Sequence, residues 1–127
     1  MIDRNEIDLL FLPGGMPGAE NLYKSEAVRS LVLFMNENKK PLAAICAAPL
    51  VFGRLGILDG KKATCYPGFE GELIGAILSS EPTVTDGHVI TGAGMGASFA
   101  LGLAAIELLD GKDKADKIRA STMIDGK

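Results

Sequence analysis

The hydrophobic residues of the chain fall into short runs separated by turn signals. One run covers residues 7–12 and ends at Pro13-Gly14-Gly15, and a second covers residues 42–45 behind Lys39-Lys40-Pro41. Short apolar runs bounded by proline and glycine are typical of buried strands. The same pattern predicts three more strands, over residues 62–65, 83–85 and 88–91.

The last two of these strands are predicted to form a hairpin. Only Asp86-Gly87 separates them, and this dipeptide between two apolar runs is the strongest short-range signal for a two-residue turn. Tyr66-Pro67-Gly68 indicates another turn, directly after the strand at 62–65.

Helical periodicity fills the segments between the strands. Ser25 can cap a helix from Glu26 to about Asn38, because its hydroxyl can accept a hydrogen bond from a free N–H of the first turn. The helix expected at 98–110 is apolar on nearly every side, which is typical of a buried helix. Further helices are expected from 49 to a cap at Gly56, from about 69 to 78 and from about 113 to 120, followed by a terminal strand or tail.

The alternation of strands and helices predicts an α/β fold, with an open, mostly parallel sheet that has helices on both faces. The chain has 127 residues, of which 47% are hydrophobic, and this suits a single domain, residues 1–127, with a sizeable core. No apolar run approaches the roughly 18 residues that a membrane span needs. A membrane is therefore not an expected partner.

The charge pattern and the rare residues narrow the function classes. The formal net charge is −3 with both signs interspersed, so nucleic acid is not an expected partner. Two cysteines and one histidine occur without metal-ligand spacing, and no signal-peptide pattern is seen; together these favour a reduced, cytoplasmic protein with no metal. The loop at 92–98 matches neither dinucleotide- nor phosphate-binding motifs, so no cofactor is expected.

Cys46 occupies the corner between the strand at 42–45 and the helix that follows. Small residues, Ala44, Ala47 and Ala48, flank it. A thiol at such a corner stands close to unpaired N–H groups of the helix N-terminus and should ionise more easily. The same design exposes the nucleophile of many hydrolases. The alternative is that Cys46 is a small buried hydrophobe, as free cysteines usually are.

Three features are expected to meet at the carboxyl edge of the parallel strands: Gly14-Gly15, Cys46 and the glycine-rich loop at 92–96. The N–H groups of Gly15 and Ala47 could there stabilise an oxyanion or an oxidised sulfur. Each glycine pair could equally form a tight turn only.

The residues around Tyr66 come close to the same edge, and Tyr66 could offer its hydroxyl to the site. Cys65 is expected to be a packed thiol. Thiol catalysis also needs a proton carrier. His88 starts a strand at the opposite edge, and Glu70 and Glu72 are expected on an exposed helix, so these residues leave that role open.

Four motifs give the chain a resemblance to the ThiJ/PfpI superfamily, and more narrowly to its branch that includes the Parkinson's-disease protein deglycase. They occur in the family's order and span almost the whole chain. The motifs are Asp-Leu-Leu-Phe-Leu-Pro-Gly-Gly (8–15), Ala-Ala-Ile-Cys-Ala-Ala-Pro (43–49), Ala-Thr-Cys-Tyr-Pro (63–67) and Ile-Thr-Gly-Ala-Gly-Met-Gly-Ala-Ser-Phe (90–99).

The resemblance implies a flavodoxin-like three-layer sandwich, a homodimer and no cofactor. It implies that Cys46 is the oxidation-sensitive nucleophile, that Gly15 and Ala47 supply backbone donors, and that Gly14, Tyr66 and Pro67 lie near the site. The activities of this branch are glyoxalase-type conversion of small dicarbonyls and repair of glycated groups. A non-catalytic redox sensor or chaperone that responds to oxidation of Cys46 is the alternative.

Two differences from the family pattern bear on function. Tyr66 stands where several members have a histidine beside the cysteine, which disfavours a PfpI-type peptidase or an amidotransferase-like hydrolase. The first third of the family fold, which holds the glutamate that acts as acid/base, would precede Met1. The chain thus resembles the C-terminal two thirds of a member, and a complementary N-terminal segment is expected in the functional protein. Without it, the first strand would keep an unpaired apolar edge.

Overall fold

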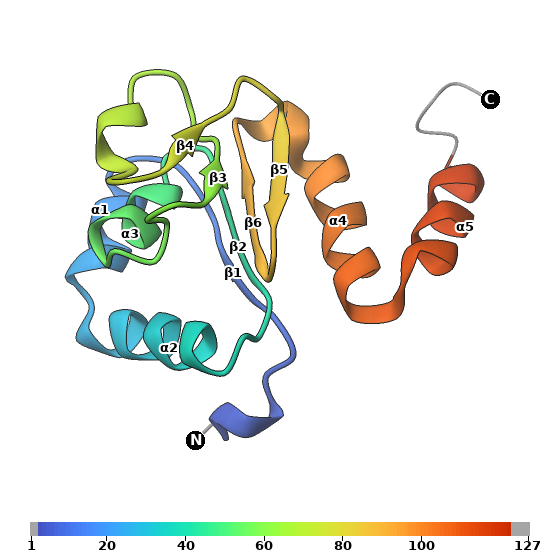
Figure 1. Cartoon of the computed structure of the whole chain (residues 1–127), viewed down its shortest axis with the longest axis horizontal. Coiled ribbons are helices and arrows are strands. Elements are labelled where there is room, and N and C mark those ends of the chain that lie inside the picture. The colour runs from blue at the N-terminus through green and yellow to red at the C-terminus, as the bar shows by residue number, and fades with distance from the viewer. Residues whose placement is uncertain (1–2, 123–127) are drawn as a thin grey trace.

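The computed structural model describes residues 3–122 and shows an α/β fold with a central four-stranded sheet (Figure 1). The strands lie in the order β1 (Leu10–Leu12), β2 (Leu42–Ile45), β6 (Val89–Gly92) and β5 (Thr83–Asp86). The first three are parallel, with Leu10 opposite Leu42, and β5 is antiparallel to β6. The expected mostly parallel sheet is confirmed.

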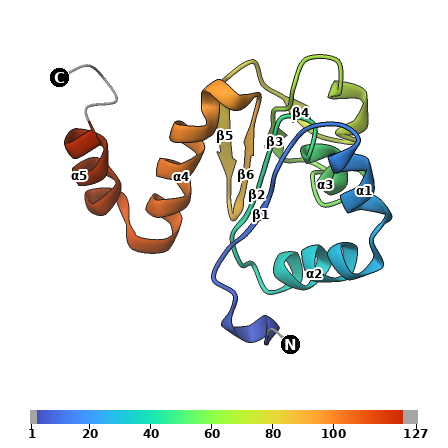
Figure 2. The same ribbon diagram turned by 180° about the vertical axis from the view of Figure 1, so that it is seen from behind.

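Helices cover both faces of this sheet. α1 (Gly18–Lys24), α2 (Glu26–Glu37) and α3 (Pro49–Arg54) lie on one side, and α4 (Ser98–Asp110) lies on the other. α5 (Lys112–Thr122) packs against α4, farther from the sheet (Figure 2). This is the three-layer arrangement expected of a flavodoxin-like fold, with α5 added outside it.

The central strand β2 contributes side chains to both hydrophobic layers, and all four of its residues are buried. Leu42 and Ala44 belong to the larger core, which includes Met35 of α2 and Phe52 of α3. Ala43 and Ile45 belong to a second cluster with residues of β6 and α4. A strand that is apolar on both faces is typical of a covered parallel sheet, and this one places residue 46 at the sheet's edge.

The cap of α2 follows the sequence prediction. The Ser25 hydroxyl accepts a hydrogen bond from the Val28 N–H over 3.3 Å, and the helix runs from Glu26 to Glu37. Val32 and Met35 are buried on its inner face. The first strand is shorter than expected: it begins at Leu10 rather than at residue 7. Arg4–Glu6, ahead of it, forms a 3-10 turn (η1).

The helix expected over residues 69–78 is wrong. The segment instead forms a 3-10 turn, η2 (Glu70–Glu72), and then a short strand, β4 (Ile77–Leu78), which pairs in parallel with β3 (Lys62–Ala63). Gly75 adopts φ +78°, a left-handed conformation that ends helical geometry. The expected helical stripe is correspondingly absent: Ile74, Ile77 and Leu78 are exposed.

The hairpin is present, but its turn lies one residue later than predicted. Asp86 pairs with Val89, so Gly87 and His88 are the two loop residues. Gly87 has φ +62°, which puts glycine at the first loop position, as a type II′ turn requires. The register is therefore set by which residue can adopt positive φ.

α4 begins and ends as predicted, but it is not buried on every side within residues 3–122. Leu101 and Leu103 are buried, whereas Phe99, Leu108 and Leu109 are exposed.

β1 is an edge strand, and Phe11 on it is 43% exposed. The terminal strand or tail expected after the last helix falls on residues 123–127, outside the described part. Among residues 3–122, no helix has the length and apolar character to cross a membrane.

Candidate functional site

Cys46 adopts a left-handed backbone conformation, φ +64°, at the point where β2 turns toward α3. Its N–H donates to the Gly92 carbonyl over 2.9 Å, and its own carbonyl accepts from the Tyr66 N–H over 2.8 Å. A non-glycine residue in this region costs about 1–3 kcal/mol and persists where the surroundings enforce it. The strand-to-helix elbow predicted from sequence is therefore present, with the half-buried thiol at its corner.

Gly14 packs directly against Cys46. A Cβ added to Gly14 would overlap the Cβ of Cys46 and lie 2.6 Å from the carbonyl oxygen of Ile45. Gly15 has φ +98°, and its carbonyl accepts from the Ala19 N–H over 2.8 Å at the start of α1. The glycine pair after β1 thus has a specific role: it brings the loop against the corner residue.

The third expected feature, the glycine-rich loop after β6, joins the same edge. Gly92 accepts the Cys46 N–H. A Cβ added to Gly94 would lie 3.7 Å from the ring of Tyr66, so this loop lies beside that aromatic side chain. Tyr66 is 49% exposed. The predicted convergence of Gly14, Cys46 and Gly92 at one edge is confirmed.

Cys65 lies behind this edge and is buried, as expected. Burial raises the pKa of its thiol to about 11, the negative charges of Glu70 and Cys46 add to the increase, and a hydrogen bond from the Phe69 backbone opposes it. The preceding residue is also fixed, because the Thr64 N–H donates to the Thr91 hydroxyl oxygen over 3.0 Å. Cys65 is therefore a protonated thiol at neutral pH.

A pocket of about 240 Å³ adjoins Cys65. Glu70 is the acidic residue on its wall, and its carboxylate also accepts from the Gly68 N–H over 2.7 Å. The lining residues are Thr64, Cys65, Pro67, Glu70, Leu78, Ser79, Ser80 and Ala93. Pro67, which the resemblance places near the site, thus borders a pocket next to the second cysteine.

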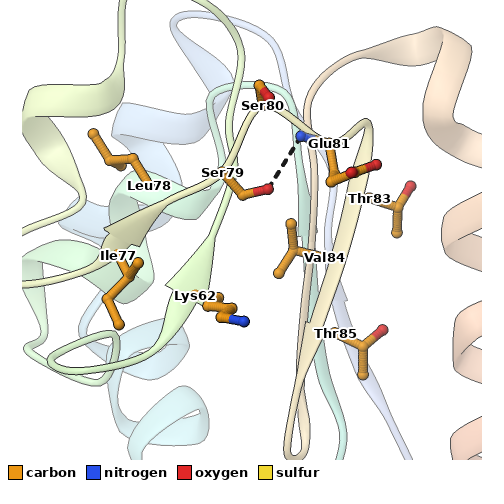
Figure 3. Close-up of a pocket in the computed structure, with 9 residues that line it drawn as sticks. All are labelled: Lys62, Ile77, Leu78, Ser79, Ser80, Glu81, Thr83, Val84 and Thr85. Atoms are coloured by element: carbon orange, nitrogen blue, oxygen red, sulfur yellow. Dashed lines mark hydrogen bonds between the residues drawn. The ribbon is translucent and has the colours of Figure 1, made fainter.

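A larger, open hollow of about 580 Å³ continues from this pocket, and Leu78, Ser79 and Ser80 line both. Figure 3 shows it between β4 and β5, with Lys62 and Glu81 on its rim. The Ser79 hydroxyl accepts from the Glu81 N–H over 3.1 Å and holds the rim segment (Figure 3). The walls of this hollow are both polar and apolar.

His88 lies at the other end of the sheet, as predicted. Its carbonyl accepts the Leu42 N–H where β2 begins, and its ring Nε2 lies 2.8 Å from the Asn36 Oδ1. Burial lowers its pKa, and the positive charges of Lys61 and Lys39 lower it further. It is part of the packing at that end and does not meet Cys46.

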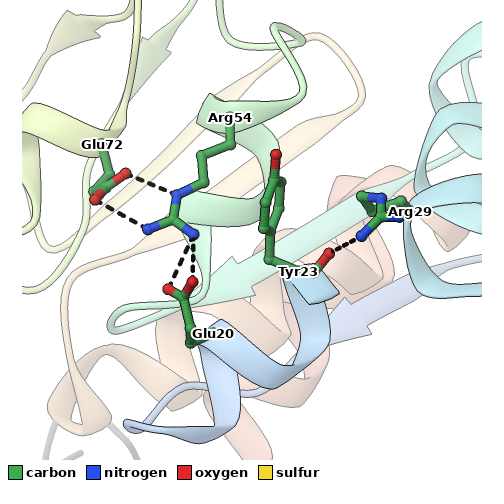
Figure 4. Close-up of polar contacts among 5 residues, drawn as sticks. All are labelled: Glu20, Tyr23, Arg29, Arg54 and Glu72. Atoms are coloured by element: carbon green, nitrogen blue, oxygen red, sulfur yellow. Dashed lines mark hydrogen bonds and ion pairs between the residues drawn. The ribbon is translucent and has the colours of Figure 1, made fainter. Parts of the chain in front are cut away.

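Sequence reasoning missed a charged cluster centred on Arg54. Its guanidinium binds the carboxylates of Glu72 and Glu20 at 2.9 Å each and lies 4.9 Å from the centre of the Tyr23 ring (Figure 4). The expectation that Glu72 lies on an exposed helix is wrong. Glu72 lies in the 3-10 turn η2, where its carboxylate is paired with Arg54. Arg29 bonds the Tyr23 carbonyl beside the cluster. The partners are 34 and 18 residues from Arg54, so no local pattern signals them.

The cluster joins three segments around the site: α1 after the Gly14-Gly15 loop, α3 after Cys46, and η2 before the pocket. Hydrogen bonding to Arg54 lowers the pKa of Glu20 and of Glu72. The paired Arg54 has a raised pKa, chiefly through Glu72. Among residues 3–122, no group of three or more His, Cys, Asp or Glu side chains is placed to hold a metal ion.

Comparison with known sequences gives a family match over most of the chain. Residues 1–108 match the sequence profile of the DJ-1/PfpI family. The chain is 37% identical over 123 residues to protein DJ-1 homolog B of Arabidopsis thaliana, covering 96% of this chain and 28% of that protein. It is 36% identical over 120 residues to the Parkinson disease protein 7 homolog of Danio rerio, covering 92% of this chain and 64% of that protein.

Solved structures agree with this match. Oxidised DJ-1 of Toxoplasma gondii superposes with a TM-score of 0.86 at 33% identity, covering 94% of this chain and 66% of that one. DJ-1beta of Drosophila melanogaster gives a TM-score of 0.85 at 30% identity, covering 95% and 67%. The chain thus spans less than a third of the plant relative and about two thirds of the fish relative.

Proposed function

Because the chain belongs to the DJ-1/PfpI family, we propose that it is a cysteine-dependent protein of the glyoxalase/deglycase type, which acts on small dicarbonyls or glycated groups through the Cys46 thiolate. The observation that carries the proposal is the left-handed Cys46 at the strand-to-helix corner, in contact with Gly14. A strained corner that presents one thiol to solvent is the arrangement that nucleophilic catalysis uses.

In the proposed reaction the Cys46 thiolate adds to the aldehyde carbon of the dicarbonyl and forms a hemithioacetal. The carbonyl oxygen becomes an oxyanion, and the N–H groups of Gly15 and Ala47 are proposed to stabilise it. The hydrogen on the former aldehyde carbon then moves as a proton to the neighbouring carbon, which converts the hemithioacetal to a thioester of the 2-hydroxy acid. Water adds to the thioester carbonyl, the C–S bond breaks, and the hydroxy acid and the free thiol are released. No cofactor is needed, because the aldehyde carbon is oxidised while its neighbouring carbon is reduced.

The proton that moves between the two carbons needs an acid/base group. The resemblance assigns it to a glutamate in a segment outside these 127 residues, so we propose that full turnover requires a complementary N-terminal segment. Glu70 is the acidic residue that the structure places on the wall of the pocket beside Cys65. A Glu70→Gln variant that retains turnover supports the external glutamate, whereas loss of turnover assigns the proton to Glu70.

The direct test is methylglyoxal consumption by the chain, with and without the complementary segment, for Cys46→Ser and for Cys65→Ala as a matched thiol control. We expect Cys46→Ser to fall to the uncatalysed rate and Cys65→Ala to retain turnover. Full turnover by Cys46→Ser contradicts the proposal.

The second candidate function is a redox sensor or chaperone, in which Cys46 is oxidised and the same N–H groups hold its oxygen atoms. The half-buried position of Cys46 favours this candidate, because only small molecules such as peroxides can reach the thiol. Stoichiometric oxidation without dicarbonyl turnover would select this candidate.

Assembly and location are also proposals. A homodimer is supported by the resemblance and by the exposed apolar side chains Phe99, Leu108 and Leu109 of α4, and sedimentation of the purified chain tests it. A reducing, cytoplasmic compartment is supported by the two cysteines, both free in this structure.

A further inference from the structure

Cys46 and Cys65 lie next to each other although 19 positions separate them in the chain. The hydrogen bond from the Tyr66 N–H to the Cys46 carbonyl is 2.8 Å long. Standard bond lengths then keep the Cα atoms of Cys46 and Cys65 at most about 7.6 Å apart. This value is an upper bound, because hydrogen bonds bend at both atoms, and disulfides typically span 4.4–6.8 Å between Cα atoms.

The two thiols differ in environment in a way that suits a sequential reaction. Cys46 is half-buried at the corner, and Cys65 is buried behind it, 5% exposed. Cys46 is the third cause of the raised Cys65 pKa, after burial and the charge of Glu70. A small oxidant therefore reaches Cys46 first and leaves Cys65 as a protonated reserve thiol.

We propose that Cys65 is the resolving cysteine of a peroxide-driven switch, in which oxidised Cys46 forms an intramolecular disulfide with Cys65. The inference rests on the proposed reactivity of Cys46. The Cys46 thiolate attacks one oxygen of a hydroperoxide, the O–O bond breaks, and the departing alkoxide or hydroxide takes a proton. Cys46 loses two electrons to the peroxide and becomes a sulfenic acid.

In the second step the Cys65 sulfur attacks the sulfenic sulfur of Cys46. The S–S bond forms, the S–O bond breaks, and the leaving hydroxide takes the proton released by the Cys65 thiol, so that water departs. Two equivalents of a small thiol reverse the reaction. The disulfide protects Cys46 from irreversible oxidation to the sulfinic acid.

The raised pKa of Cys65 makes the second step slow at neutral pH and strongly pH-dependent. Because the thiolate is the attacking species, its fraction and hence the rate should rise about tenfold per pH unit below the pKa of about 11. Sulfenic acid should therefore be trappable at neutral pH and short-lived under alkaline conditions.

The experiment treats the full chain with one equivalent of hydrogen peroxide under alkaline conditions, where the Cys65 thiolate can react, with or without dimedone, and follows intact mass and peptide maps. We expect the wild type to lose two hydrogen atoms, to become resistant to alkylation at both cysteines, and to recover with dithiothreitol. Cys65→Ala and Cys65→Ser should instead accumulate dimedone-reactive Cys46 and then sulfinic acid. Using both substitutions guards against misfolding of either one.

The remaining outcomes separate the two proposals. Dimedone labelling of Cys46 that is equal in wild type and in the Cys65 variants, with no loss of hydrogen, overturns the resolving role but leaves Cys46 reactive. Absence of both labelling and disulfide overturns the reactivity of Cys46 and the switch together. Disulfides found only between two chains also overturn the intramolecular assignment.

Discussion

Gly14 and Cys46 lie so close together at the edge of the sheet that no side-chain atom fits between them. A Cβ on Gly14 would overlap the Cβ of Cys46 and lie 2.6 Å from the carbonyl oxygen of Ile45. The loop after β1 and the corner after β2 therefore hold each other in place, and the position of the thiol depends on a missing side chain on its neighbour.

Gly14→Ala is expected to displace the Cys46 corner. The added methyl group meets backbone atoms, which cannot rotate away, so stability should fall by about 1–3 kcal/mol, and Cys46 alkylation should change rate. Urea unfolding and timed iodoacetamide labelling measure the two effects. Gly18→Ala is the matched control, because a Cβ there has no neighbour within 4 Å. Equal stability of the two variants would contradict this account.

Thr91→Val is expected to loosen the segment that carries Cys65 and Tyr66. The Thr91 hydroxyl accepts the Thr64 N–H over 3.0 Å, and both residues are buried. Valine keeps the shape but leaves this N–H without a partner, which costs about 1–3 kcal/mol. Thr91→Ser keeps the hydroxyl, which should still accept the Thr64 N–H. Its stability should fall less, because only a methyl group is lost. Hydrogen exchange at the Thr64 amide reports the bond directly, and unchanged protection in the valine variant would rule it out.

The parts of the fold that follow local rules could be predicted from the sequence. Ser25 caps α2 because its own hydroxyl reaches the first turn, and Cys46 sits at the corner because an apolar strand directly precedes a helix. The convergence of Gly14 and Gly92 on Cys46 follows from the parallel strand order.

The errors arose where long-range contacts or a single backbone angle decide the structure. Residues 69–78 have helical spacing, but Gly75 at φ +78° ends any helix, and Ile77 pairs with the strand at Lys62. The hairpin turn lies one residue later than predicted, because glycine occupies the first loop position, where φ is positive. The Arg54 cluster depends on carboxylates that are distant in the sequence, so no periodic pattern of residues predicts it.

Arg54→Ala is expected to reduce stability and to change its dependence on pH. Hydrogen bonds from Arg54 lower the pKa of Glu72 and of Glu20 below the ordinary 4.5. Groups with lowered pKa stabilise the fold above the unfolded value and lose this contribution as the pH falls through the folded value. The Tm of the wild type should thus fall between pH 6 and pH 3 through this cluster, and the Tm of Arg54→Ala should fall less.

The comparison needs a variant that retains the charge. Arg54→Lys keeps one positive charge but cannot bind two carboxylates at once in the forked geometry of arginine, so its Tm should fall between those of wild type and Arg54→Ala. Calorimetric scans across this pH range for the three proteins measure the effect. Parallel curves for wild type and Arg54→Ala would show that the cluster contributes nothing to acid sensitivity.

Glu70→Gln is expected to lower the pKa of the Cys65 thiol. Burial is the larger cause of its increase to about 11 and the charge of Glu70 the second, so removing that charge should bring the pKa down while leaving it above the ordinary 9.0. The thiolate fraction at a given pH then rises, and disulfide formation with oxidised Cys46 should become faster. Ultraviolet titration of the thiolate in a Cys46→Ser background gives the pKa, with Glu81→Gln, on the rim of the larger hollow, as the control charge removal. An unchanged Cys65 pKa in Glu70→Gln would show that burial alone sets it, and the disulfide step should then keep its wild-type rate.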